Sequence, residues 1–178
     1  MIEIILSFPQ SKEMSKIAYN SPNNIKLSDD IIALCRVNAC GNYNKNWTCP
    51  PNLGDLDNLQ AKISSFNHYL VIQNIFSLED SFDIEGMEFA MKVHDKRIRD
   101  LADKFKEEFP NIECLLLGCG GCKACEKCAY PNPCVQPEKA LASVEGMGIN
   151  VPQLVGKVDF EYINGVNTVS YVGLLLWK

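Results

Sequence analysis

Histidine is scarce in this sequence, which contains only His68 and His94 among its 178 residues. A catalytic Cys–His pair therefore has few histidines to draw on, and no Ser–His–Asp set is visible. The glycine-rich stretch at 118–121 is not followed by Gly-Lys-Ser or Gly-Lys-Thr, so it is not a phosphate-binding P-loop. The sequence thus gives little support to a Ser or Cys nucleophile or to a P-loop.

Long basic runs and long hydrophobic runs are also absent. The formal net charge is −5 at pH 7, and we expect no nucleic-acid partner. The longest apolar run, near 174–177, is far shorter than the roughly 20 residues of a membrane-spanning helix, so no membrane association is expected. The first residues lack the basic segment and the cleavage site of a secretory signal. We therefore expect a cytoplasmic protein.

The apolar pattern predicts one metal-binding domain over residues 1–178, because hydrophobic residues make up 47% of the chain. Strands are predicted at 2–6, 68–76, 113–117, 158–162 and 168–177, and helices at 54–66, 85–109 and 138–147. Residues 11–28 are polar and turn-rich, and 29–34 form a short helix or strand. The strand–helix–strand order over 68–117 favours a parallel pair, and Asn164-Gly165 indicates a hairpin. The predicted fold class is α/β, or α+β, with a mixed sheet, flanking helices and long cysteine-rich metal-binding loops.

Cysteine is the residue that is unexpectedly abundant, with nine in the chain. In a reducing compartment these thiols are not expected to form disulfides. Cys122, Cys125, Cys128 and Cys134 have the C-x2-C-x2-C spacing with a later fourth Cys that bacterial ferredoxins use for iron–sulfur clusters. Structural zinc sites usually separate two C-x2-C pairs by a dozen residues or more, so the overlap favours a [4Fe–4S] cluster over zinc. Cys119 could replace any one of the four.

A second set comprises Cys35, Cys40 and Cys49, in a loop rich in Asn, Gly and Pro. Three exposed thiols would be prone to oxidation, so we predict that they bind metal, and the chain would then hold either one [4Fe–4S] cluster or two. Either Cys114 or Cys119 completes the set, or one metal keeps an open position. Simple packing as small apolar side chains is the alternative for cysteine, and it suits Cys114 in the apolar run 114–117.

Both motifs resemble a family of predicted metal-binding proteins of unknown function from anaerobic bacteria and methanogenic archaea. The shared residues are Cys40, Tyr43 and Trp47 through Pro51, then Cys122 through Cys134 with Pro137, and finally Ser143, Glu145, Gly148, Ile149 and Val151. The resemblance implies metal binding by Cys35, Cys40, Cys49, Cys122, Cys125, Cys128 and Cys134. It supplies no reaction, and it leaves Cys114 and Cys119 as additions in this chain.

The leading hypothesis from the sequence is an iron–sulfur protein of anaerobic metabolism. It would transfer electrons to a redox partner protein or activate a partner enzyme. The alternatives are a structural zinc-binding interaction module and an enzyme that uses an open-site cluster. His94 lies on the apolar stripe of the 85–109 helix, where a packed, hydrogen-bonded core histidine is expected. The charged residues of that helix predict a solvated face with ion pairs.

Overall fold

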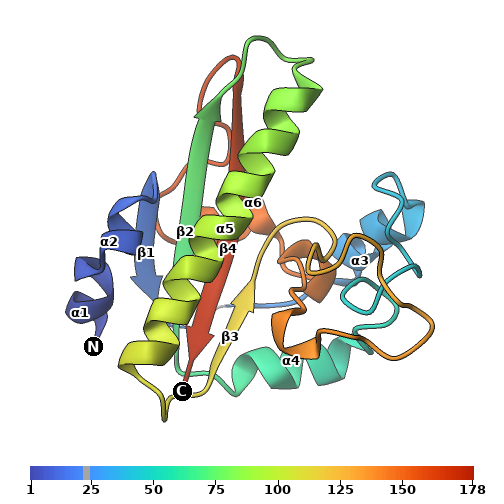
Figure 1. The fold of residues 1–178 in the computed structure, drawn as a ribbon, viewed down its shortest axis with the longest axis horizontal. Coiled ribbons are helices and arrows are strands. Elements are labelled where there is room, and N and C mark those ends of the chain that lie inside the picture. Colours follow the sequence, from blue (N-terminus) through green and yellow to red (C-terminus); the bar gives the residue numbers. More distant parts are fainter. Residues whose placement is uncertain (22–24) are drawn as a thin grey trace.

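The structure is a computed structural model that describes residues 1–21 and 25–178 (Figure 1). Its elements, in chain order, are α1 (Ile2–Ser7), α2 (Pro9–Lys12), β1 (Lys16–Asn20), α3 (Asp29–Val37), α4 (Leu56–Ser64), β2 (His68–Ser77), α5 (Ile84–Glu108), β3 (Cys114–Leu117), η2 (Pro137–Lys139), η3 (Glu145–Met147), α6 (Val151–Gly156) and β4 (Thr168–Trp177). Within the described ranges, none of the helices has the length and apolar character needed to cross a membrane.

A four-stranded sheet in the order β1-β2-β4-β3 organises the molecule, and every neighbouring pair of strands is antiparallel. The predicted fold class is confirmed, with helices flanking one sheet. The prediction that the two strands flanking α5 pair with each other was wrong. β2 and β3 do run in the same direction on either side of α5 in the sequence, but β4 lies between them. The last six residues of β4 are buried, and its residues 174–177 are paired with β2 on one side and with β3 on the other.

Both faces of the sheet are buried, because successive side chains of β2 and β4 point to opposite sides. Tyr69 and Val71 join a core with α4 and α6, whereas Leu70 and Ile72 join a second core with α1, α2 and α5. Figure 1 shows α5 crossing one face of the sheet and the cysteine loops gathered beyond β3, beside α3 and α4. The continuous apolar run of β2 follows from this double burial.

Two predicted strands are not formed. Residues 2–6 form helix α1 instead, with Ile5 fully buried in the second core. A five-residue segment with four apolar residues fits a buried helix as well as a strand. Residues 158–162 are irregular, because the amides of Val158 and Phe160 donate to Val155 O at the end of α6 and are not free for a partner strand. Strand β1, an edge strand inside the polar stretch 11–28, was not predicted.

The predicted helix over 138–147 is also wrong. The segment holds two short 3-10 helices, η2 and η3, separated by extended backbone. Gly118 N donates to Ala142 O (2.9 Å), and Val144 N donates to Gly118 O (2.9 Å). These bonds extend the edge of the sheet past β3 and use the amide and carbonyl groups that a helix would need. Gly148 ends η3 in the left-handed conformation (φ 83°), as its position suggested.

Candidate metal centre

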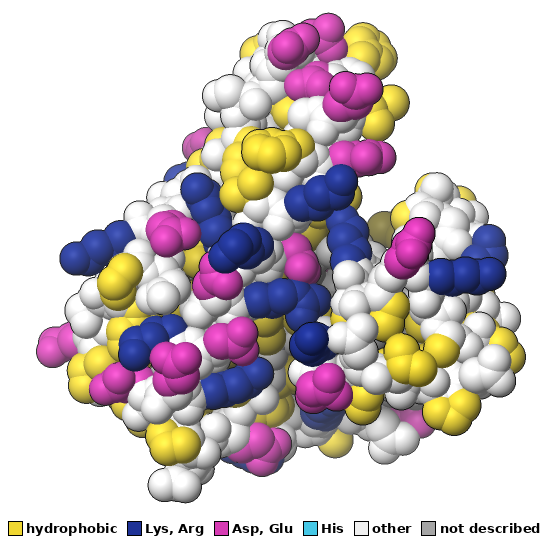
Figure 2. Space-filling view, viewed as in Figure 1, with side chains coloured by type: hydrophobic (Ala, Val, Ile, Leu, Met, Phe, Trp, Pro, Cys, Tyr) yellow, Lys and Arg dark blue, Asp and Glu magenta, His cyan; other side chains and the backbone are white. Residues whose placement is uncertain are grey.

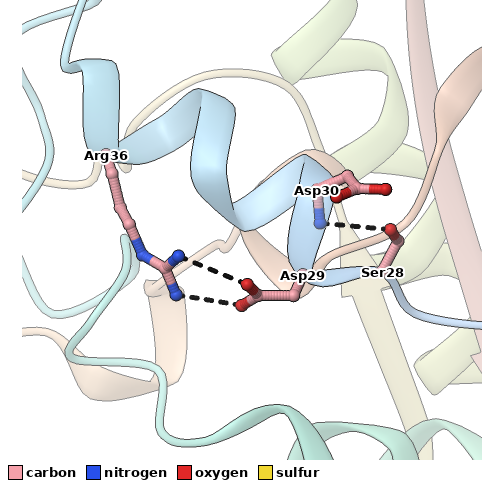
Figure 3. A network of polar contacts seen from close by, with 4 residues as sticks. All are labelled: Ser28, Asp29, Asp30 and Arg36. Atoms are coloured by element: carbon pink, nitrogen blue, oxygen red, sulfur yellow. Dashed lines mark hydrogen bonds and ion pairs between the residues drawn. The ribbon is translucent and has the colours of Figure 1, made fainter.

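Helix α3 places Cys35 at the start of the first cysteine loop. Ser28 caps the helix, its hydroxyl accepting from Asp30 N (3.2 Å), and Asp29 forms a two-bond ion pair with Arg36 (2.9 and 3.3 Å; Figure 3). Both charged side chains are exposed, so the cap is the more important of the two for holding the helix. The helix ends at Asn38, which is left-handed (φ 59°) and turns the chain toward Cys40.

The three cysteines of the first loop line one cavity of about 240 Å³. Cys49 is buried, Cys35 is half-buried and Cys40 is exposed at the cavity mouth. The remaining lining residues come from both parts of the chain: Tyr43, Pro50, Gly120, Gly121, Ser143, Glu145 and Gly146. The first loop therefore meets the segment after β3 and the turn at η3 around a shared space.

The thiols of this cavity are close enough to affect one another's ionisation. Burial raises the pKa of Cys49, while a hydrogen bond with Asn46 lowers it and the charges of Cys40, Cys35 and Cys122 raise it again. Burial also raises the pKa of Cys35, followed by the charges of Cys40 and Glu145. Thiols that disfavour one another's ionisation are suited to a bound cation, which would stabilise the thiolate forms.

The second cysteine loop leaves the sheet at Gly118, directly after β3. Cys122, Cys125, Cys128 and Cys134 all line a second, smaller cavity of about 20 Å³, together with Trp47 and Thr48 from the first loop. All four thiols are half-buried. The loop returns across its own start, where the Gln136 amide donates to Ala124 O (3.0 Å) and to Cys125 Sγ (3.4 Å). The four cysteines of the ferredoxin-like motif thus surround one space.

The two loops are packed against each other through Trp47. Its Nε1 donates to Asn132 O (2.8 Å), and its ring meets Tyr130 edge-on with centroids 5.1 Å apart. The Tyr130 hydroxyl in turn donates to Asn44 Oδ1 (2.9 Å). Closer to the thiols, Cys122 N donates to Thr48 Oγ1 (3.3 Å). Because these hydrogen bonds join the two loops, the conformation of each loop depends on the other.

The residues present fit metal centres by their chemistry, although they are not in bonding geometry. In the described ranges 1–21 and 25–178, no three His, Cys, Asp or Glu side chains converge closely enough to bind a metal ion as they stand. The donor sets are nonetheless thiol-rich, as zinc and iron–sulfur clusters require. Backbone also approaches the first cavity closely: Gly120 has a φ of 66°, and a Cβ on Gly121 would lie 2.8 Å from Asn42 Oδ1. Metal binding would therefore tighten these loops, because site formation and local folding are linked.

The other two cysteines do not line either cavity. Cys119 directly follows the bridge residue Gly118, and burial and then the charge of Glu145 raise the pKa of its thiol to about 12. Cys114 packs against the second core, as expected for a structural thiol. Neither is placed to complete the first set in this arrangement, so Cys119 as a ligand stays a prediction.

Both histidines have structural roles. His94 is fully buried, and its Nδ1 lies 3.0 Å from Asn74 Nδ2. His68 stacks on Trp177 and bonds to the Tyr19 hydroxyl (2.8 Å). The predicted core histidine is therefore confirmed, as are the ion pairs of α5, which join Lys96 to Asp100 and other pairs along its solvated face.

Glu145 was named from the sequence among the residues shared with the resembled family, but it was not predicted to lie in a metal site. It is half-buried at the start of η3 and is the one carboxylate among the described residues that line the first cavity. A signal was present, because an acidic residue stands alone in the apolar stretch 141–151. An unpaired charge in such a segment is unusual unless it has a partner or a function.

Comparison with known proteins gives one match, to a family. No curated protein and no solved structure matches the chain. The family comparison matches residues 20–177, which include all nine cysteines and both cavities. That match covers nearly the whole chain, and the chain therefore belongs to the predicted metal-binding protein family (DUF2284).

Proposed function

We propose that the protein is an iron–sulfur electron carrier with two centres, one held by Cys122, Cys125, Cys128 and Cys134 and the other in the first cavity. The observation that carries the proposal is that the two cavities share a wall. Thr48 lines the second cavity and Cys49 the first, and likewise Cys122 lines the second and Gly121 the first. Consecutive Cα atoms are only about 3.8 Å apart, so centres in these cavities would be near neighbours.

Iron–sulfur clusters account for the residues better than single zinc ions do. The overlapping C-x2-C-x2-C spacing is the ferredoxin form, and the first cavity is many times larger than one ion needs. The second cavity, of about 20 Å³, would have to widen around a cluster. When bound, a cluster would supply one-electron redox chemistry. The chain's own part is to hold the cluster by its thiolates, to shield it with Trp47 and to bring backbone amides near it through the glycines. The resemblance to proteins of anaerobic organisms supports a cytoplasmic role in anaerobic metabolism.

A redox partner protein would dock on the groove beside the second loop. This groove has a volume of about 730 Å³ and lies between α5, β3 and η2. Six basic side chains line it against four acidic ones: Lys92, Lys96, Arg99, Lys106, Lys123 and Lys139 against Asp95, Asp100, Asp103 and Glu138. Figure 2 shows Lys and Arg side chains gathered over α5 on this face of an otherwise acidic protein. The excess of positive charge favours a partner with an acidic surface.

Anaerobic purification with iron, sulfide and zinc analysis tests the proposal. The expected protein is brown, holds iron and sulfide, and gives a low-temperature electron paramagnetic resonance signal after reduction. Cys125→Ser should remove one cluster's iron and sulfide and Cys40→Ser the other's, with Cys114→Ser as the matched control that leaves both. A colourless protein with stoichiometric zinc, even after reconstitution with iron and sulfide, would refute electron transfer and favour a structural zinc module.

A further inference from the structure

The first cavity has three thiols and needs a further donor, and among the described residues its walls offer three other polar side chains. Two of these are already engaged. The Ser143 hydroxyl accepts from Gly146 N (2.9 Å), and the Tyr43 hydroxyl interacts with the Arg36 guanidinium. The third is the Glu145 carboxylate. Apart from its own backbone amide, it has no hydrogen-bond or ion-pair partner in the part of the chain that the structure describes.

The fold positions this carboxylate against Cys35 with several independent restraints. Helix α3 packs on η3, and Ser28 N donates to Gly148 O (2.8 Å), so the start of α3 is tied to the end of η3. On the other side, the bridge between Gly118 and Ser143 anchors the residues just before Glu145. Glu145 and Cys35 line the same cavity. The position of Glu145 is therefore set by the edge of the sheet and by helix α3, which carries Cys35.

A carboxylate that lines this cavity beside three thiols is costly in the metal-free protein, since no hydrogen-bond or ion-pair partner among the described residues offsets its partial burial. The same group becomes favourable once a metal centre occupies the cavity, because carboxylate oxygen is an accepted ligand beside thiolates for zinc and for iron. We infer that Glu145 is the fourth protein ligand of the first centre, which makes it a Cys3Glu site beside the all-cysteine second centre. The inference rests on the proposed function only in that a metal centre occupies this cavity.

A Cys3Glu site would differ from its neighbour in a defined way. Oxygen is a harder donor than thiolate, so the metal position that Glu145 holds would be the one most readily exchanged. The four-thiolate centre would serve as the stable electron store, and the mixed centre would be the one open to small-molecule ligands. The two centres therefore have separate roles, and a single residue distinguishes them.

The test uses the full-length chain carrying Cys125→Ser and Cys128→Ser, so that the first centre is the only thiol-rich site. Anaerobic titration with Co²⁺ reports binding through thiolate-to-cobalt absorbance. Adding Glu145→Gln should weaken Co²⁺ binding by about 10–100-fold or more, because even residues that only hydrogen-bond to a metal ligand typically contribute that much to affinity. Glu138→Gln, an exposed glutamate on η2, is the matched control and should leave affinity unchanged. Glu145→Cys should restore the affinity, which a purely structural glutamate would not do.

The results separate the two proposals. If Cys40→Ser abolishes Co²⁺ binding but Glu145→Gln stays within about twofold of its parent, with unchanged circular dichroism, Glu145 is not a ligand and the inference is overturned. If the wild-type protein holds zinc without iron and sulfide, yet Co²⁺ affinity still depends on Glu145, the ligand assignment stands and the iron–sulfur function fails.

Discussion

Acidification should destabilise this protein through His94, and the structure gives the size of the effect. His94 is fully buried, and burial lowers its pKa from the ordinary 6.5 to about 4, with Arg97 contributing and Asp95 opposing. A hydrogen-bond network explains why the neutral form is required. Arg97 donates to Asn74 Oδ1 (3.2 Å), which orients the amide so that Asn74 Nδ2 donates to His94 Nδ1. Nδ1 must therefore be an acceptor, and a proton there would break the bond.

The magnitude follows from linkage between protonation and folding. In the unfolded chain His94 binds a proton near pH 6.5, but in the folded protein only near pH 4. The stabilising effect of neutral His94 is thus complete above pH 6.5 and is lost as pH falls toward 4. Between pH 7 and pH 5 the free energy of unfolding should drop by about 2 kcal/mol from this residue alone, and by about 3 kcal/mol below pH 4.

Urea unfolding of the wild type and of His94→Gln, at pH 7 and at pH 5, measures the contribution of His94 to the free energy of unfolding. Glutamine cannot be protonated, and its side-chain oxygen can still accept from Asn74. The carboxylates and thiols that titrate elsewhere contribute equally to both proteins, so they cancel in the difference. The wild-type midpoint should fall by about 1 M urea more than the variant's between pH 7 and pH 5. Equal shifts in the two proteins would refute the reasoning from the network.

Three further predictions concern the loops, the groove and the core. Trp47→Ala should loosen the docking of the two cysteine loops by about 1–3 kcal/mol, seen as faster metal loss from the second centre to a chelator; the exposed Phe82→Ala should have no effect. Charge reversal at Lys92 and Lys123 should slow electron exchange with an acidic one-electron carrier at low salt, with the difference vanishing at high salt. Leu174→Ala should cost about 2–5 kcal/mol in urea unfolding, because the side chain is fully buried in the first core.

The sequence pattern alone was enough to predict the long helix and the long strands, and to identify the two cysteine sets as ligand candidates. The helix α5 and the strands β2 and β4 have strong periodicity or sustained apolar character over ten or more residues, and such signals are local. The spacing of Cys122, Cys125 and Cys128 is likewise a property of one short segment, as is the burial of His94 on the apolar stripe of its helix. These features need no knowledge of what lies across the fold.

Which distant segments contact one another is determined by long-range packing, and the sequence pattern did not predict it. Short apolar runs such as 2–6 and 158–162 took their conformation from the surfaces they pack on, not from their own residues. The insertion of β4 between β2 and β3 depends on pairing across more than fifty residues of chain. The same holds for the contact between Thr48 and Cys122, and for the position of Glu145 opposite Cys35. Spacing identifies the thiols as ligand candidates, but long-range packing determines which of them share a cavity and which carboxylate joins them.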